Sequence, residues 1–435
     1  MLTAITRAFR TPDLRKKLLF TLGIIVLFRL GSVLPTPGVN AQNVALCLEQ
    51  AQAGDSGNIY GMVQLFSGGA LLKLSVFALG IMPYITASII LQLLTVVIPR
   101  LEALKKEGQS GTAKITQYTR YLTIGLAVLQ STAFVALARS GQLFPNCNEQ
   151  ILLSQEVFPL VTMVVTMTAG TAVIMWLGEL VTDRGVGNGM SILIFTQVIA
   201  VFPSELVNIF RQSPFKFVIV MIVGIVMIGV VVFIEQAQRR IPVQYAKRMV
   251  GRRMYGGTST YIPLKVNQAG IIPVIFASSL LYLPQLLVTL FGNSQNPNVV
   301  VDWLARNLVQ GDSAVYMAVF FAMIVFFTYF YVSITFNPPE VADNMKKYGG
   351  FIPGIRPGRP TAEYLSYVLN RLTATGAPYL GFISLIPIIA LGAVGASQNF
   401  PFGGTSILIM VGVGLDTVKQ IESQLQQRNY EGFLR

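Results

Sequence analysis

Few residues of this sequence are of the types that catalyse reactions or bind metals. It contains no histidine and only two cysteines, Cys47 and Cys147. Histidine is the usual general base near neutral pH and the commonest metal ligand, so its absence excludes His-based catalysis and argues against a Cys/His metal site. We predict no catalytic residue, no metal and no bound cofactor. Both cysteines fall in segments that we expect outside the cytoplasm, where a disulfide could form. The sequence leaves their pairing open.

Glycine-rich segments are the second place where chemistry could reside. Residues 108–114 end in a lysine but have the wrong spacing for a phosphate-binding loop. Residues 185–189 follow an apolar helix, whereas a dinucleotide-binding loop follows a strand. We therefore interpret residues 185–189 as the turn that ends a helix, and we predict no nucleotide site in this chain.

Ionisable side chains are scarce in the middle of the apolar segments. An ion-coupled transporter generally needs such groups inside the membrane. Arg29 is the main candidate, and an arginine near the end of a span more often extends its charge to the surface. The acidic residues that border apolar segments all fall at predicted cytoplasmic helix ends: Glu179, Asp183, Glu235 and Asp416.

Apolar side chains at helical spacing are more informative. Ile81 and Ile85 lie four residues apart, as do Met190 and Ile194, so each pair shares one face of a helix. Ordinary helix packing explains most stripes of this kind. The functional alternative is a hydrophobic constriction that closes a pore by excluding water.

The segment before Ile81 is interrupted. Residues 60–72 are apolar but too short to span a bilayer, and they are broken by Gly68 and Gly69, while Pro83 follows at the start of the next apolar run. A broken half-segment that leads into a full one indicates backbone at membrane depth inside the protein or a cavity. A kinked helix after a surface turn is the alternative.

The elements that position these residues are predicted to cross a membrane. Of the 435 residues, 53% are hydrophobic and 12% charged, whereas a soluble protein carries roughly a quarter charged residues. Long apolar runs recur along the chain, which predicts an all-α polytopic membrane protein. The ten predicted transmembrane helices are Leu18–Leu34, Leu74–Ile98, Tyr121–Leu137, Phe158–Leu180, Met190–Phe210, Phe217–Ile234, Ile271–Phe291, Ala314–Phe336, Ala377–Ala396 and Thr405–Val418.

The distribution of lysine and arginine predicts the orientation. Basic residues crowd the N-terminal segment, every second loop and the C-terminal tail, so both termini are expected in the cytoplasm. Five helices precede the turn at 210–217 and five follow it, which predicts two inverted halves, residues 1–212 and 213–435, around a central pathway. The second helix of each half carries the prolines, Pro83 in one, Pro273 and Pro284 in the other.

Two cytoplasmic loops, about 236–267 and 337–375, combine basic residues with aromatic residues and tight turns. Basic loops near a membrane most often serve as orientation signals or face lipid. The interleaved aromatic residues and the turn-rich tip at 350–358 favour docking of a large acidic partner, such as ribosomal RNA, or of a protein motor.

Four long motifs in this sequence resemble the SecY family, which forms the central subunit of the bacterial Sec protein-conducting channel. The resemblance runs from the first span to the C-terminal tail. The motifs are GIMPYITASII at 80–90, RGVGNGMSI at 184–192, NQAGIIPVIFASS at 267–279 and GFIPGIRPG at 350–358.

The resemblance implies a clamshell of two five-helix halves around an hourglass pore that opens sideways to lipid. It also implies roles for individual residues. The pore ring would comprise Ile81, Ile85, Met190, Ile194, Ile275 and Ile409, where Met190 departs from the isoleucine usual in the family. The plug segment, residues 60–72, would include Tyr60, Phe66, Ser67, Gly68 and Gly69. The lateral gate would include Thr86, Gln92, Asn267 and Leu283, and motor or ribosome docking would use Arg252, Arg253, Arg356 and Arg359.

By the same resemblance, the chain would translocate unfolded secretory polypeptides across the cytoplasmic (inner) membrane and insert membrane segments laterally into the lipid bilayer. The implied partners are the small subunits SecE and SecG, the motor SecA, the ribosome, signal sequences and preproteins. Two other classes of function stay open: a secondary transporter for small solutes, which also uses inverted repeats, and an intramembrane enzyme. Neither explains the docking loops.

Overall fold

The computed structural model describes residues 11–53, 68–139, 150–154, 156–245, 248–250, 253–255, 259–291, 299–309, 313–394 and 404–432, together with residues 9, 141 and 147. It is mostly helical, and each predicted span overlaps a helix. The helices are α2 (Pro12–Val33), α3 (Ala41–Ala53), α5 (Met82–Val97), α6 (Pro99–Lys106), α7 (Gln109–Arg139), α8 (Val157–Arg184), α9 (Gly189–Gln212), α10 (Pro214–Gln236), α11 (Ile272–Phe291), α12 (Val299–Leu304), the π-helix η1 (Ala305–Val309), α13 (Ala314–Thr335), α14 (Pro338–Lys347), α15 (Arg359–Val394) and α16 (Gly404–Gly432).

Length and apolar composition identify a smaller set of clear membrane spans than the ten predicted. Within the described ranges, four helical stretches qualify, and a fifth does if α5 and α6, which meet at a bend of 100°, count as one span. The four are α7, α8, residues 217–236 of α10, and residues 314–347. Helices α9 and α11 each contain a proline, Pro203 and Pro284, and each contributes only a shorter apolar stretch.

The second predicted span is wrong in its first third. Residues 74–81 form a chain of turns, and α5 begins only at Met82, with Pro83 in its first turn. Leu74 and Gly80 both have positive φ, 46° and 57°, which is incompatible with a continuous right-handed helix. Most of the side chains from Ala70 to Ile81 are nevertheless buried. This irregular backbone therefore lies inside the protein, as the broken sequence indicated.

The prediction of an all-α chain did not anticipate the strands in the predicted loop at about 236–267. Strands β1 (Gln238–Tyr245) and β4 (Ser259–Lys265) pair in antiparallel register from Gln238↔Lys265 to Gln244↔Ser259. We call these two strands the ribbon. The short strand β5 (Gly350–Phe351) pairs with the end of β1, while β2 (Arg248–Val250) and β3 (Arg253–Tyr255) form a second hairpin beyond the ribbon.

The ribbon is amphipathic, which explains why it forms. Ile241 and Val243 of β1 are buried and alternate with exposed neighbours, as expected of a half-covered strand. They pack with Leu264 of β4 and with residues of α14, α15 and the 350–358 turn: Met345, Ile352, Leu365 and Val368. The two predicted cytoplasmic loops thus share one apolar core.

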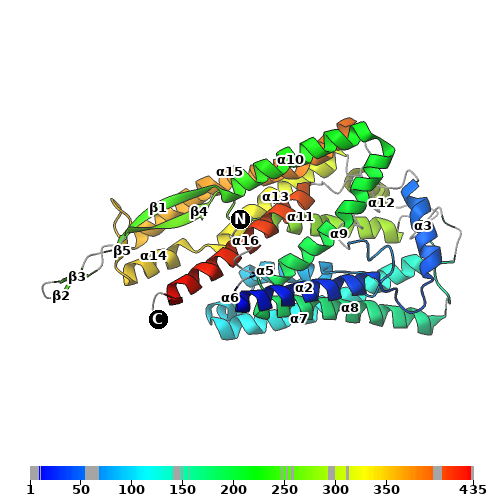
Figure 1. Ribbon diagram of the computed structural model, residues 1–435, viewed down its shortest axis with the longest axis horizontal. Coiled ribbons are helices and arrows are strands. Elements are labelled where there is room, and N and C mark those ends of the chain that lie inside the picture. The colour runs from blue at the N-terminus through cyan, green and yellow to red at the C-terminus, as the bar shows by residue number, and fades with distance from the viewer. Residues whose placement is uncertain are drawn as a thin grey trace.

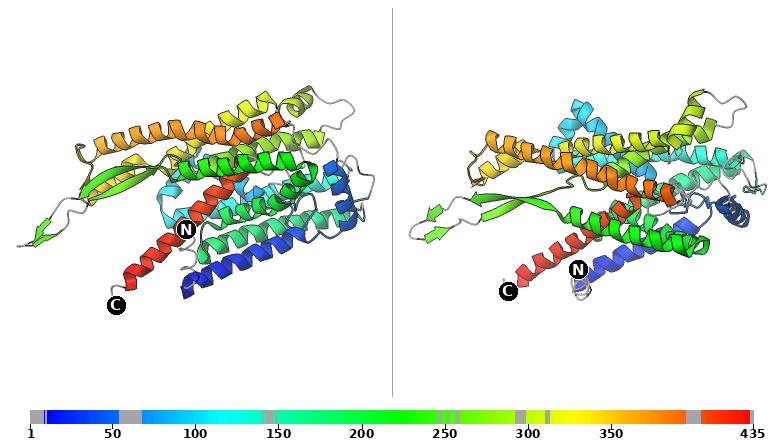
Figure 2. Two further views of the ribbon diagram at one scale, coloured as in Figure 1. Left: turned by 45° about the horizontal axis from the view of Figure 1, so that its top comes forward. Right: turned by 90° about the horizontal axis from the view of Figure 1, so that it is seen from above.

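Figures 1 and 2 show how the helices are arranged. In Figure 1, α2, α7 and α8 lie together at the bottom, α10, α13 and α15 lie at the top, and α9 and α16 run between them. The strands, α14 and the end of α16 project from one end of the molecule, whereas α3 and α12 lie at the other (Figures 1 and 2). The largest hydrophobic cluster draws on residues of α2, α5, α8–α11, α13, α15 and α16.

Candidate functional site

All six residues predicted for the pore ring meet in the largest hydrophobic cluster of the molecule. Ile81, Ile85, Ile275 and Ile409 are buried members of it, and Met190 and Ile194 are half-buried and pack against it. They come from four places far apart in the sequence: the start of α5, and helices α9, α11 and α16. The six side chains therefore share one apolar core that several helices build, and their arrangement as a ring stays a prediction.

Helix starts position most of these side chains. Ile81 is the N-cap of α5, and its carbonyl oxygen accepts the backbone N–H of Ile85 at 3.1 Å. The amide oxygen of Asn188 caps α9 by accepting the backbone N–H groups of Met190 and Ser191, at 3.1 and 3.4 Å. Ile275 lies in the first turn of α11. The first turns of three different helices thus supply four of the six apolar side chains.

Met190 is held differently from the isoleucines. Its sulfur lies directly over Gly178 of α8, so closely that a Cβ atom at position 178 would overlap it. The flexible thioether therefore packs partly against α8 while it contacts the apolar cluster. A larger residue at position 178 would force this flexible side chain to shift.

Only the end of the predicted plug segment is described. Tyr60, Phe66 and Ser67 lie outside the described residues, whereas Gly68 and Gly69 are placed, both with positive φ. A Cβ atom on Gly68 would approach the backbone of Gln197 in α9 to 3.3 Å. The guanidinium of Arg29 donates a hydrogen bond to the Gly68 carbonyl oxygen at 3.5 Å. Arg29 thus contacts the plug segment instead of only extending its charge to the surface.

The two predicted gate helices, α5 and α11, pack against each other. Their hydroxyl and amide groups bond locally: Thr86 donates to the carbonyl of Met82, and Gln92 donates to Ser88. Ser278 of α11 likewise bonds within its own helix. Among the residues that the structure describes, no hydrogen bond joins α5 to α11, so apolar packing holds this contact. Leu283 belongs to α11, but its side chain lies outside the described set.

Asn267 has a partner that the sequence did not reveal. It is buried in the turn before α11, and its side-chain amide donates to the Glu235 carboxylate and to the Gly270 carbonyl. Glu235 itself is buried at the end of α10. The two residues lie 32 positions apart and meet because the ribbon that separates them folds back on itself. Predicting this pair would have required the register of the ribbon, and the basic composition of that segment did not indicate strands.

The four predicted docking residues differ in their surroundings. Arg252 lies outside the described residues, and Arg253 belongs to β3, where side chains are not described. Arg359 forms an ion pair with Glu363 one turn along α15, at 3.0 Å. Arg356 is exposed at the tip of the 350–358 turn and has no acidic partner among the described residues. The Arg356 carbonyl accepts a hydrogen bond from Thr361, which fixes the turn.

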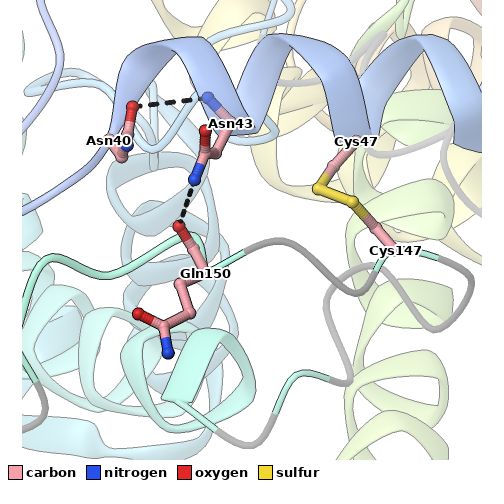
Figure 3. The surroundings of a disulfide bond; sticks show 5 residues. All are labelled: Asn40, Asn43, Cys47, Cys147 and Gln150. Carbon is pink, nitrogen blue, oxygen red and sulfur yellow. Dashed lines mark hydrogen bonds between the residues drawn. A yellow bond between two sulfur atoms is a disulfide. The ribbon is translucent and has the colours of Figure 1, made fainter.

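The two cysteines, whose pairing the sequence left open, form a disulfide (Figure 3). It joins Cys47 of α3 to Cys147, which lies between α7 and α8, across 100 residues of sequence. Beside it, the side-chain amide of Asn43 donates to the Gln150 carbonyl oxygen at 2.8 Å, as Figure 3 shows. The backbone N–H of Asn40 bonds to Ile151. Helix α3, which precedes the plug segment in sequence, is therefore fixed to the connection between α7 and α8.

Comparison with known proteins places this site in context. The model of the SecY family matches residues 75–418. The protein translocase subunit SecY of Streptomyces coelicolor is 68% identical over 442 residues, which covers all of both chains. That of Mycobacterium tuberculosis (strain H37Rv) is 60% identical over 445 residues, again covering all of both.

Solved structures show the same fold. One of them is a SecY structure, which concerns how the plug domain stabilises the closed state of the translocation channel. It matches with a TM-score of 0.62 and 19% identity, over 94% of this chain and 91% of that one. This likeness supports the fold, whereas the sequence matches over the full length establish the relationship. The family is one of channel-forming translocase subunits and not of catalytic enzymes. The chain belongs to the SecY family of protein translocase subunits.

Proposed function

We propose that the six-residue pore ring is the constriction through which this translocase subunit passes unfolded polypeptides across the membrane. The ring side chains are apolar and come from four separate elements, so they can move apart and close again around a chain of any sequence. An apolar constriction also stays dry when it is empty, which blocks ions without a specific binding site.

The contact between α5 and α11 is the proposed lateral gate. It relies on apolar packing rather than on interhelical hydrogen bonds of the described residues, so parting it breaks no strong polar contact between the two helices. A signal sequence or membrane segment that entered the gap would partition into lipid, driven by about 25 cal/mol per Å² of its apolar surface. Thr86, Gln92, Asn267 and Leu283 are the residues assigned to this gate.

The plug segment, residues 60–72, is proposed to rest against the ring in the closed channel. The position of Gly68 beside α9 and its hydrogen bond with Arg29 support this role. The plug domain of the similar solved SecY is described as stabilising the closed state and maintaining a membrane seal. We extend that role to this chain.

The end of the molecule that carries the ribbon, α14 and the C-terminal part of α16 is the proposed cytoplasmic face, in the cytoplasmic membrane and with both termini inside. The crowding of basic residues into the segments at this end supports the orientation. Arg252, Arg253, Arg356 and Arg359 would dock SecA or a ribosome, which supply the energy. Sec61 of a canine ribosome–channel complex has the same fold, with a TM-score of 0.61 and 18% identity over 94% of this chain and 91% of that one. SecE and SecG are the proposed small membrane subunits. Within this chain, the two halves, residues 1–212 and 213–435, are proposed to move relative to each other.

The observation that supports this proposal is that the six apolar side chains, from four separate elements, all belong to or pack against one hydrophobic cluster. To test it, a photocrosslinking residue is placed at Ile275 and, as a control of the same side-chain type, at Ile225, which is 64% exposed on α10. A secretory chain is then stalled in the reconstituted channel. Crosslinks from position 275 but not from 225 are expected. Equal or absent crosslinks at the two positions would mean that the six residues are ordinary packing, and would favour the small-solute transporter.

A further inference from the structure

Glu235 is a buried carboxyl group with no role in the pore ring, plug or docking surface. It ends α10, the helix from which the ribbon emerges, and its side chain accepts a hydrogen bond from Asn267 in the turn before gate helix α11. The backbone N–H of Val266 also bonds to the carbonyl of Ala237. The start of the gate helix is therefore tied to the end of α10 through one side-chain bond and one backbone bond.

A second donor lies near this carboxyl group and is unused. The Tyr379 hydroxyl of α15 is inaccessible to solvent and has no hydrogen-bond partner among the described residues. Gly376, one turn earlier on the same face of α15, packs so closely on the 266–267 backbone that an added Cβ atom would lie 2.6 Å from the Val266 carbonyl oxygen. Helix α15 also contacts α10 and α11, so we treat Glu235, Asn267 and Tyr379 as one polar cluster at this contact.

Opening the gate would disturb this cluster. If α11 swings away from α5, the turn that carries Asn267 moves as well, and Glu235 loses its donor. A buried carboxyl group without a hydrogen bond is costly, so such a movement would be opposed unless another donor replaced the amide. Lys265, at the end of β4, is paired with Asp416 at 3.4 Å. Tyr379 is the neutral donor that is free to replace Asn267.

We propose that Glu235 exchanges hydrogen-bond partners during gating, bonding to Asn267 when the gate is closed and to Tyr379 when it is open. The inference rests on the proposed gating function of α5 and α11. It makes Glu235 and Tyr379 positioning residues that act through α11 and touch no translocating chain. The closed pair is itself incomplete, because the buried side-chain oxygen of Asn267 accepts no bond from the described residues. This lowers the penalty for leaving the closed arrangement.

The test measures the gate directly. Spin labels are attached to cysteines introduced at Val96 of α5 and Leu280 of α11, both exposed, while the native cysteines stay bonded to each other and unlabelled. The full-length channel with its small subunits is reconstituted in liposomes. EPR distance distributions are recorded with and without a synthetic peptide that has a basic N-terminus and about 12 leucines, the core length of a signal sequence. The ratio of long to short distances gives the open-to-closed ratio.

Two substitutions are expected to move this ratio in opposite directions. Tyr379→Phe removes only the hydroxyl and should lower the peptide-induced open-to-closed ratio about tenfold, the effect of one lost hydrogen bond to a charged group. Asn267→Ala should raise the ratio, because it removes the bond of the closed state. Tyr367→Phe, at an exposed site on the same helix, is the matched control and should change nothing.

The outcomes distinguish a failure of the partner exchange at Glu235 from a failure of the proposed gate. In one outcome, the peptide lengthens the distance between the two spin labels in the unmodified channel, but Tyr379→Phe leaves the open-to-closed ratio unchanged or raises it. The exchange of hydrogen-bond partners would then be wrong, whereas the proposed gate would still be supported. If the peptide does not lengthen the spin-label distance in the unmodified channel, the proposed gate is wrong, and the exchange of hydrogen-bond partners, which rests on it, is wrong as well. A purely structural role would lower thermal stability in both variants without opposite shifts in the ratio.

Discussion

At the scale of single residues, the proposed constriction consists of apolar side chains only. Ile275 and Ile409 are buried on helices α11 and α16, and both contact the cluster that includes Ile81. A polar group in their place would attract water into the constriction. The closed channel is therefore expected to be sensitive to polarity at these positions more than to volume.

We expect Ile275→Asn to make the resting channel leak ions. The amide hydrates the constriction and loosens a packed contact, at a cost of about 2–4 kcal/mol to the closed state. Single-channel conductance in planar bilayers without a translocating chain measures the leak. Ile225→Asn on the exposed face of α10 is the control, and unchanged conductance at position 275 would count against the ring.

The sequence predicted the six ring residues but not the Glu235–Asn267 pair. Helical spacing singled out Ile81 with Ile85 and Met190 with Ile194, whereas Ile275 and Ile409 came from the family resemblance alone. The buried pair joins two residues that appear, in sequence, to be a helix end and an unrelated loop. Its formation depends on the register of β1 against β4, which a local pattern does not specify.

At the scale of elements, the irregular segment before α5 is the unusual part of the fold. It is buried although it is not helical, so neighbouring helices must fit its backbone closely. The best example is Gly170 of α8, whose position leaves room for the carbonyl group of Val76 and for the ring of Phe77. The sequence predicted an interruption here from Pro83 and the upstream glycines. It did not predict where the helix would resume, because buried apolar turns have the same composition as a buried helix.

Gly170→Ala is expected to destabilise the protein by about 1–3 kcal/mol, because the added methyl group would overlap the Val76 carbonyl and displace the segment. The melting temperature in detergent measures the effect, with unfolding monitored by a fluorescent dye that does not react with thiols. Gly229→Ala on α10 is the matched control. Nothing lies within 4 Å of its added methyl group, so a stabilisation of about 0.5–1 kcal/mol is expected there. Equal melting temperatures for the two variants would contradict this account of α8.

At the scale of the whole molecule, the two ends carry different structural elements. One end carries the ribbon, α14 and the 350–358 turn, which share a small apolar core of their own. The other end carries α3, α12 and the disulfide (Figure 1). A partner that docked on the ribbon would contact a unit that has its own apolar core and that continues into α10 and α15.

Reversing the charge of Arg356 should block translocation that SecA drives, by at least about tenfold, while the thermal stability of the channel stays unchanged. The side chain is exposed and unpaired among the described residues, so its loss affects a partner and not the fold. The measurement is protease protection of a preprotein in proteoliposomes supplied with SecA and ATP. Arg306→Glu at the opposite end of the molecule is the control; if both variants translocated normally, the docking role of Arg356 would be wrong.

The disulfide between Cys47 and Cys147 has a consequence for chain connectivity. It closes a covalent loop that contains the plug segment, α5, α6 and α7. A single proteolytic cut anywhere between the two cysteines would therefore add two new chain ends but leave one covalently joined molecule and not two separate fragments. On a non-reducing gel the nicked protein would migrate as one species, and on a reducing gel it would separate into two.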